Sequence, residues 1–206
     1  MPSQPDKSPE LSAYVLAMVE LQKTLNKDSD EALELFRFAT PEFCTRTIVR
    51  TLSAEFEAMI FFLAELLVKL NCIDSKVFNL SPEELNVLKS ESLMIKRNGD
   101  ISVTQKFYPF QERMLFVLKM AAKILNPDAM PNTNDSNWAN VKSFIKIRNR
   151  LTHPKSLSDL HITDNEVDDL NGAQDWVRAS VSAIFTAGAT GEALTKYIAA
   201  HNNKPQ

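Results

Sequence analysis

The feature that most constrains the fold is a long helical repeat of apolar residues that follows Thr40 and Pro41. Threonine is a favourable helix N-cap, and proline is well accepted at the first position of an α-helix. Apolar side chains then recur every three or four residues for about five turns, the pattern of a helix with one buried face. A helix of this kind needs other helices against it, so we expect it to form the centre of a helical bundle. The repeat consists of Leu52, Phe56, Met59, Ile60, Leu63, Leu66, Leu67 and Leu70.

Several other segments show the same period and carry helix-start signals. Two capping boxes mark helix starts. Ser81 with Glu84 predicts the start of a short helix that ends near residue 91, and Thr163 with Glu166 predicts the start of the last helix. The last helix could continue, with a break near its glycines, to His201. Apart from the central and short helices, the expected helices cover residues 11–25, 29–39, 109–125, 138–152 and 164–187.

Residues 92–106 are the one region with a period of two. Apolar residues alternate on both sides of Asn98-Gly99, a dipeptide that favours a two-residue β-hairpin turn. The fold prediction is therefore an all-α protein, an up-and-down helical bundle of four to five long helices with a small β-hairpin insertion. Residues 11–200 should form a single helical domain. Residues 1–10, which are polar and proline-rich, are expected to be a disordered N-terminus.

The composition limits the classes of function. Only four of the 206 residues are glycine, too few for a glycine-rich phosphate loop or a turn-rich β-sandwich. The longest apolar run, residues 59–70, is interrupted by Glu65 and Lys69 and is too short to cross a bilayer. We therefore expect a soluble, cytoplasmic protein without a membrane partner. Because the net charge is −3, nucleic-acid binding would need a local basic patch.

Cysteine and histidine usage gives no sign of a metal or a disulfide. Cys44 and Cys72 should lie on the central helix, about 40 Å apart and beyond disulfide reach. No cluster of cysteine, histidine or carboxylate residues has metal-ligand spacing. We expect reduced structural thiols, no metal and no cofactor.

Side chains that can act as an acid, a base or a phosphate ligand are concentrated at residues 144–155. Arg148 is followed directly by Asn149 and, five positions after the arginine, by His153. Pro154 disfavours helical geometry at the residue before it, so the helix should end at or just before His153. Helical positions step by about 100°, so Arg148 and His153 do not share a face.

The position of Arg148 sets a requirement on its surroundings. It falls inside the apolar arc of its helix, whereas Lys142 and Lys146 lie on the other side with the histidine. An unpaired buried charge is very costly, so the arginine needs a carboxylate, a subunit interface or a ligand anion. Glu55 borders the apolar stripe of the central helix and is the expected partner.

Arg148, Asn149 and His153, late in an amphipathic helix of an all-helical chain, resemble the signature of the HEPN superfamily (higher eukaryote and prokaryote nucleotide-binding domains). Many of its members are metal-independent ribonucleases. The resemblance implies a homodimer in which two motifs face a shared cleft and cleave RNA by attack of a ribose 2′-hydroxyl on the adjacent phosphate. In that mechanism the histidine is general acid or base, the arginine stabilises the phosphorane, and the asparagine orients one of them. Cations expected to attract RNA phosphates are Lys146, Arg150 and Lys155.

Three functions remain open. The first is this endoribonuclease, as a toxin or phage-defence protein of a prokaryote with an antitoxin protein as a partner. The second is a catalytically inactive HEPN-like module that binds RNA, a nucleotide or a partner protein. The third is a helical interaction protein in which Arg148 forms an ion pair between helices and His153 caps its helix, favoured by the helix dipole. Trp138 and Trp176 are expected in the core or an interface and not as platforms for bases.

Overall fold

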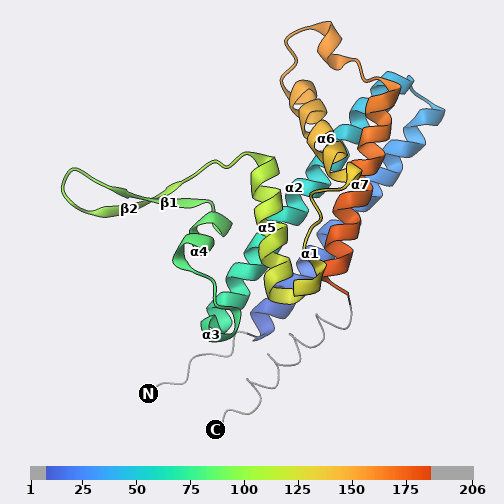
Figure 1. The fold of residues 1–206 in the computed structure, drawn as a ribbon. Helices are drawn as coiled ribbons and strands as arrows, with labels where there is room; N and C mark the ends of the chain where they lie inside the picture. Colours follow the sequence, from blue (N-terminus) through green and yellow to red (C-terminus); the bar gives the residue numbers. More distant parts are fainter. Residues whose placement is uncertain (1–7, 187–206) are drawn as a thin grey trace.

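Between residues 8 and 186 the fold is built from five long α-helices that pack side by side, with a hairpin extending from them (Figure 1). The structure is a computed structural model and describes residues 8–186. The expected all-α bundle with a small β-hairpin is confirmed. The long helices are α1 (Ser8–Glu34), α2 (Pro41–Ile73), α5 (Phe110–Leu125), α6 (Ser136–Thr152) and α7 (Asp164–Ile184).

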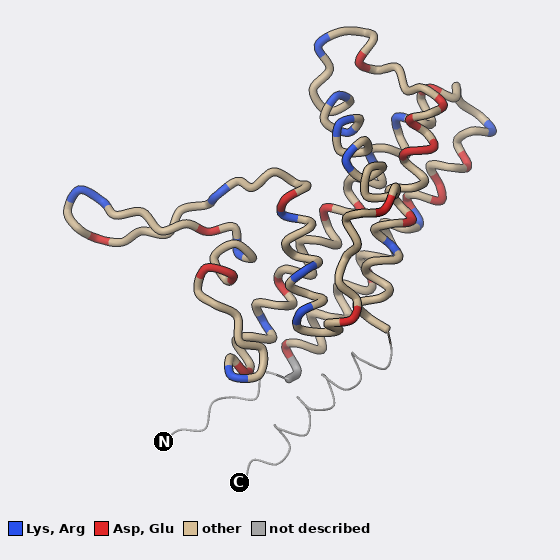
Figure 2. Tube along the Cα trace, in the orientation of Figure 1, with Lys and Arg blue, Asp and Glu red and all other residues tan. Residues whose placement is uncertain are grey.

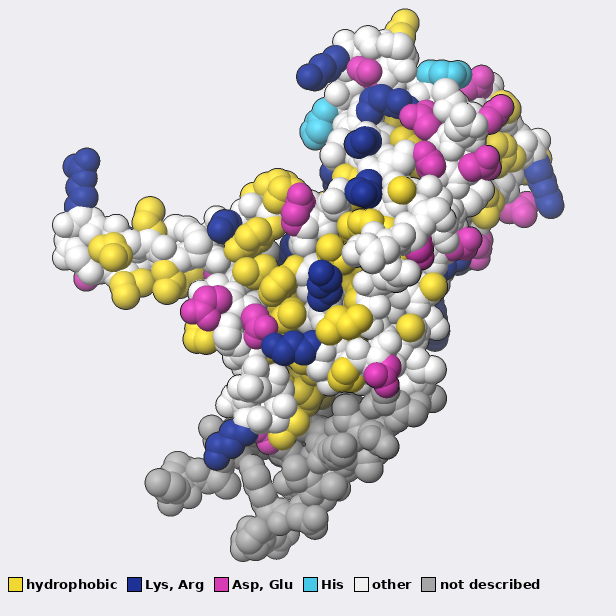
Figure 3. Space-filling view, in the orientation of Figure 1, with side chains coloured by type: hydrophobic (Ala, Val, Ile, Leu, Met, Phe, Trp, Pro, Cys, Tyr) yellow, Lys and Arg dark blue, Asp and Glu magenta, His cyan; other side chains and the backbone are white. Residues whose placement is uncertain are grey.

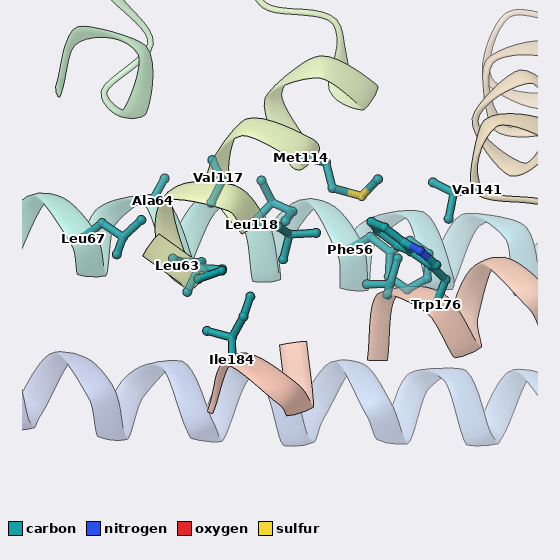
Figure 4. Packing of buried hydrophobic residues seen from close by; sticks show 14 of the residues in the cluster. Phe56, Leu63, Ala64, Leu67, Met114, Val117, Leu118, Val141, Trp176 and Ile184 are labelled. Atoms are coloured by element: carbon teal, nitrogen blue, oxygen red, sulfur yellow. The ribbon is translucent and has the colours of Figure 1, made fainter. Parts of the chain in front are cut away.

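The central helix is α2, as the apolar repeat predicts. Thr40 caps it, with the side-chain oxygen accepting a hydrogen bond from the Phe43 N–H at 3.4 Å, and Pro41 occupies the first helical position. Its 33 residues span about 50 Å. Helix α2 contacts all four other long helices, and its apolar stripe faces side chains from α5, α6 and α7 (Figure 4).

Aromatic pairs fill the core where α6 meets its neighbours. Phe56 of α2 and Phe144 of α6 are packed edge to face, with ring centroids 5.2 Å apart. Trp138 of α6 and Trp176 of α7 are buried with centroids 4.8 Å apart, and the indole N–H of Trp176 donates to the Asn132 carbonyl at 2.8 Å. The expectation that both tryptophans belong to the core is therefore confirmed.

The two helices expected at residues 11–25 and 29–39 form one continuous helix instead. Helix α1 runs without a break to Glu34 and is followed by a 3-10 turn, Leu35–Arg37. Ser29, at the expected start of the second helix, is buried and donates its hydroxyl to the Glu55 carboxylate at 3.2 Å. A tertiary contact thus takes the hydroxyl that a local cap would need. The helix also begins at Ser8, inside the expected N-terminal disordered segment; residues 1–7 lie outside the described residues.

Short elements follow α2 and lead into the hairpin. They are α3 (Ser75–Phe78), α4 (Pro82–Leu88), β1 (Glu91–Ile95) and β2 (Ile101–Gln105). The Ser81–Glu84 capping box that starts α4 is present as predicted. The strands form an antiparallel two-stranded sheet that projects away from the helices as an arm (Figure 1).

The turn of this arm differs from the two-residue turn that Asn98-Gly99 predicted. Three residues separate Lys96 from Asp100, whose backbone groups are joined by a hydrogen bond of 2.8 Å. Gly99 closes the turn in the left-handed region, with φ +86°, and donates its N–H to the Lys96 carbonyl at 2.9 Å. Glycine is therefore needed here for its conformation, although at a different position of the turn.

The last two helices are present, but α6 begins at Ser136, two residues before the expected start, and α7 ends at Ile184, three residues before the expected end at 187. Helix α6 ends at Thr152, and the capping box of Thr163 and Glu166 starts α7. The expected extension of the last helix towards His201, and the end of the domain at residue 200, lie outside the described residues. Both cysteines lie on α2 as free thiols. Within residues 8–186 no helix is long and apolar enough to span a membrane.

Candidate functional site

The motif helix α6 is fixed at both ends. At its start, the Asp135 carboxylate accepts hydrogen bonds from the backbone N–H groups of Asn137 and Trp138, at 2.6 and 3.1 Å. At its end, the N–H of His153 donates to the Asn149 carbonyl at 3.1 Å, and Pro154 follows. Arg148 therefore lies in the last turn and a half of the helix, and His153 is its C-terminal cap residue.

Arg148 joins α6 to α2 through an ion pair. One terminal nitrogen, Nη2, pairs with Oε1 of Glu57, and the other donates to Oδ1 of Asn149 at 2.9 Å. The arginine side chain is 28% exposed and the glutamate side chain 44% exposed, so solvent reaches both. The expected carboxylate partner on the central helix is present. The choice of Glu55, however, is wrong.

Glu55 faces the opposite side of α2, because two helical positions are about 200° apart. It is buried, and its carboxylate accepts from the Ser29 hydroxyl at 3.2 Å and from Gln22 Nε2 at 3.5 Å. Arg178 of α7 lies 3.5 Å from the same carboxylate. Glu55 therefore ties α1, α2 and α7 together and has no part in the surroundings of Arg148.

Two cavities lie on either side of the Arg148–Glu57 pair. The larger, of about 1080 Å³, is an open groove bounded by α2, α5, α6 and the root of the hairpin arm. Its walls include both partners of the ion pair, Asn149 and several aromatic side chains, among them Phe61, Phe107 and Tyr108. The smaller, of about 210 Å³, is lined by Arg148 and Glu57 together with Arg50, Ser53 and Thr152. Arg148 can therefore reach ligands on two sides.

His153 is not brought together with Arg148 in one chain. It is exposed at the end of α6, lines neither cavity, and its imidazole makes no hydrogen bond to any residue from 8 to 186. Asn149, in contrast, lies with Arg148 at the groove. The motif is thus divided between the groove wall and the end of the helix.

The predicted phosphate-binding cations have different surroundings. Basic residues are concentrated along α6 (Figure 2). Lys146 and Lys155 are exposed, and their ammonium groups form no ion pair with a described residue. The guanidinium of Arg150 is instead held by Glu166, at 2.9 and 3.1 Å, and by the His161 carbonyl at 2.7 Å. This clamp between α6 and the start of α7 replaces the predicted phosphate contact of Arg150.

The same clamp changes the ionisation of Glu166. Burial favours the neutral acid and acts to raise the pKa of Glu166, but the hydrogen bonds from Arg150 and from the Thr163 N–H outweigh burial, so its pKa is lowered. The pKa of Asp159 is also lowered, chiefly by a hydrogen bond from the Lys155 N–H. That contact, at 2.7 Å, holds the loop that follows the motif.

Sequence reasoning missed Glu57 and the aromatic wall of the groove. A signal was present, since Arg50, Ala54, Glu57 and Phe61 recur at helical spacing beside the buried stripe of α2 and form its exposed edge.

In the described ranges there is no group of three or more histidine, cysteine or acidic residues that could hold a metal ion. Comparison with protein-family models, curated proteins and solved structures gives no match for this chain.

Proposed function

We propose that this protein is a metal-independent endoribonuclease of HEPN type, acting as a homodimer in which the motifs of two copies face a shared cleft. The observation that carries the proposal is the placement of Arg148 and Asn149. They are joined by a hydrogen bond of 2.9 Å and lie together in the wall of a groove of about 1080 Å³. A partly exposed arginine at an open groove is suited to a phosphate, because its fork of donors matches the phosphate oxygens.

The proposed reaction needs only protein groups. The ribose 2′-hydroxyl attacks the adjacent phosphorus, its proton passes to a base, and the 5′-oxygen leaves with a proton from an acid. The products carry a 2′,3′-cyclic phosphate and a 5′-hydroxyl. Histidine changes its charge near neutral pH, so His153 serves as base or acid. Arg148 stabilises the charge of the phosphorane, for which it exchanges Glu57 for the phosphate.

The second copy follows from the division of the motif. Arg148 and His153 are on different sides of α6, and the histidine lines neither cavity. In a homodimer, His153 of one copy can face Arg148 of the other across a shared cleft. Lys146 and Lys155, both exposed on or after the same helix, hold the RNA backbone on each side of the cut.

The proposal extends to the setting of the protein. It is a cytoplasmic toxin or phage-defence protein, and its partners are RNA and an antitoxin protein that blocks the groove.

The test is cleavage of end-labelled structured RNA in EDTA by the wild-type protein and by Arg148→Ala and His153→Ala. We expect products that end in 2′,3′-cyclic phosphate, with the rate lowered by about 10²–10⁴ in each variant. Lys142→Ala is the matched control, since Lys142 is exposed on α6 and lines neither cavity. Helical circular dichroism should be the same in all four proteins. Cleavage that survives both substitutions contradicts the catalytic assignment.

The second candidate is a catalytically inactive HEPN-like module that binds RNA, a nucleotide or a partner protein. It is favoured by the ion pair with Glu57, which neutralises Arg148 in the free protein. The two candidates differ in one measurement. RNA that binds the wild-type protein, with Arg148→Ala weakening binding and no product formed, identifies the inactive module.

A further inference from the structure

The hairpin arm has one apolar face that nothing in residues 8–186 covers. In the antiparallel register, Leu93 pairs with Val103 and Ile95 pairs with Ile101, which places these four side chains on the same face of the sheet. They are 62%, 58%, 76% and 69% exposed. The other face is mostly polar, with the hydroxyls of Ser92 and Thr104 hydrogen-bonded to each other at 2.9 Å.

An exposed apolar hairpin of this kind is an unfavourable structure for an isolated chain. A two-stranded hairpin is at best marginally stable in water and needs a further strand or a packed face. The arm projects from the bundle (Figure 1), and apolar side chains are visible along it and around its root (Figure 3). At the root, Phe107 is 90% exposed and borders the groove described above.

The structure points to a second copy of this chain as the partner of the arm: we propose that two arms pack apolar face against apolar face, antiparallel, about a two-fold axis. This inference builds on the proposed homodimer and names the surface that forms it. A two-fold contact uses the same patch on both copies, so one arm covers the other. The axis then passes near Leu93 and Val103, the middle pair of the arm.

Charge and length agree with this arrangement. Each strand has five residues and spans about 17 Å, so an antiparallel pair of arms brings the tip of each to the root of the other. The tip carries Lys96 and Arg97, which form no ion pair with any described residue, while Asp100 is hydrogen-bonded by Asn98. The root of the partner offers Glu112, which is exposed and lines the outer part of the arm's attachment to α5. Opposite charges therefore meet at both ends.

The apolar area of the arm fits a weak, concentration-dependent dimer. Four aliphatic side chains and Phe107, each more than half exposed, offer on the order of 500 Å² of apolar surface per copy. Complete pairing removes on the order of 1,000 Å² from water in total, and the charged tips add to it, which is the size of a weak, transient interface.

The first test is sedimentation of the full chain from micromolar to submillimolar concentration. We expect a monomer–dimer equilibrium whose Kd rises about tenfold or more in the double variant Ile95→Thr with Ile101→Thr. Threonine keeps the strand propensity, so the hairpin itself should still form. Met94→Thr is the matched control, because Met94 is exposed on the opposite face. A monomeric wild-type chain, or a dimer equally tight in the double variant, overturns the proposal.

The second test is a disulfide across the axis. In a Cys72→Ser background, which removes the exposed native thiol, Val103→Cys should form an intermolecular disulfide under mild oxidation and Met94→Cys should not. Equal crosslinking at both positions also overturns the pairing. The nuclease proposal is judged separately, because His153→Ala should remain fully dimeric while cleavage is lost.

Discussion

The two sides of α6 differ in how they are built. Towards α7, Arg150 is clamped by Glu166, the Ser143 hydroxyl donates to Asp169, and the two tryptophans pack against each other at a tilt. Towards α2, Arg148 pairs with a partly exposed glutamate between two cavities. Two arginines two positions apart on one helix thus have different surroundings.

This difference indicates that the α7 side of the helix contributes to stability and that the α2 side is suited to binding. A guanidinium held by three hydrogen bonds in a partly buried interface contributes to the free energy of unfolding and cannot easily change partner. A guanidinium that is paired with a partly exposed carboxylate beside a cavity contributes little to stability and can exchange that partner for an anion. We therefore expect substitutions on the α7 side to lower stability and those on the α2 side to change binding.

The largest expected effect on stability is that of Arg150→Met. The substitution removes the two Arg150 hydrogen bonds to the Glu166 carboxylate and the one to the His161 carbonyl, so the free energy of unfolding should fall by about 2–3 kcal/mol. The matched change Arg148→Met should cost less than about 1 kcal/mol. Urea denaturation of the two variants beside the wild type measures both. Equal losses would remove the distinction between the two sides.

Glu166→Gln should reduce the pH dependence of stability. The pKa of Glu166 is lowered in the folded protein, so its ionised form stabilises the fold at pH values above the unfolded-state pKa of about 4.3. This stabilisation is lost as the pH falls through the pKa of Glu166 in the folded protein. Glutamine keeps the capping box and removes the titration. The variant should therefore be less stable than the wild type at pH 7, and the gap should close in acid. Denaturation midpoints across this pH range test the sign; a gap that widens in acid contradicts it.

Gly172→Ala should cost about 1 kcal/mol, since a Cβ at this position of α7 would meet the amide of Asn140 on α6. Combined with Asn140→Ala, the same change should instead stabilise the protein by up to about 1 kcal/mol, because alanine favours a helix over glycine. A double-mutant cycle by thermal denaturation measures the reversal. Additive effects would show that the two helices are less closely packed here.

The smallest expected effect on stability is that of Glu57→Gln, within about 0.5 kcal/mol, because the ion pair is exposed to solvent. RNA affinity should rise, since the substitution frees Arg148 and removes a negative charge from the groove. Fluorescence anisotropy with labelled RNA, in a His153→Ala background that prevents cleavage, gives the comparison. Unchanged affinity would mean that Arg148 does not contact the RNA.

Local signals predicted most of the fold. The start of α2 at Thr40 and Pro41, the two capping boxes and the end of α6 before Pro154 each depend on neighbours along the chain, and each is present. The break expected near Ser29 failed because a contact with a residue distant in the sequence, Glu55, uses the hydroxyl. The turn around Gly99 is one residue longer than expected because the glycine takes the closing position.

The site could be predicted only in part. The sequence shows that Arg148 needs a carboxylate, but Glu55 and Glu57 are both on the central helix, and only the relative placement of α2 and α6 selects Glu57. The clamp of Arg150 was missed for the same reason, since Glu166 lies on α7, beyond a loop. The pattern of one helix specifies which face is buried and not which neighbour covers it.

The length of α2 has a geometric consequence. This one rigid rod holds Glu57 at the groove near its middle and contacts α4, from which the arm extends, near its end. The direction of the arm is therefore tied to the direction in which the groove faces. If two arms pair about a two-fold axis, the arms set the angle between the two α2 helices. They thereby also set the distance between the two Arg148 side chains, which does not depend on bound RNA.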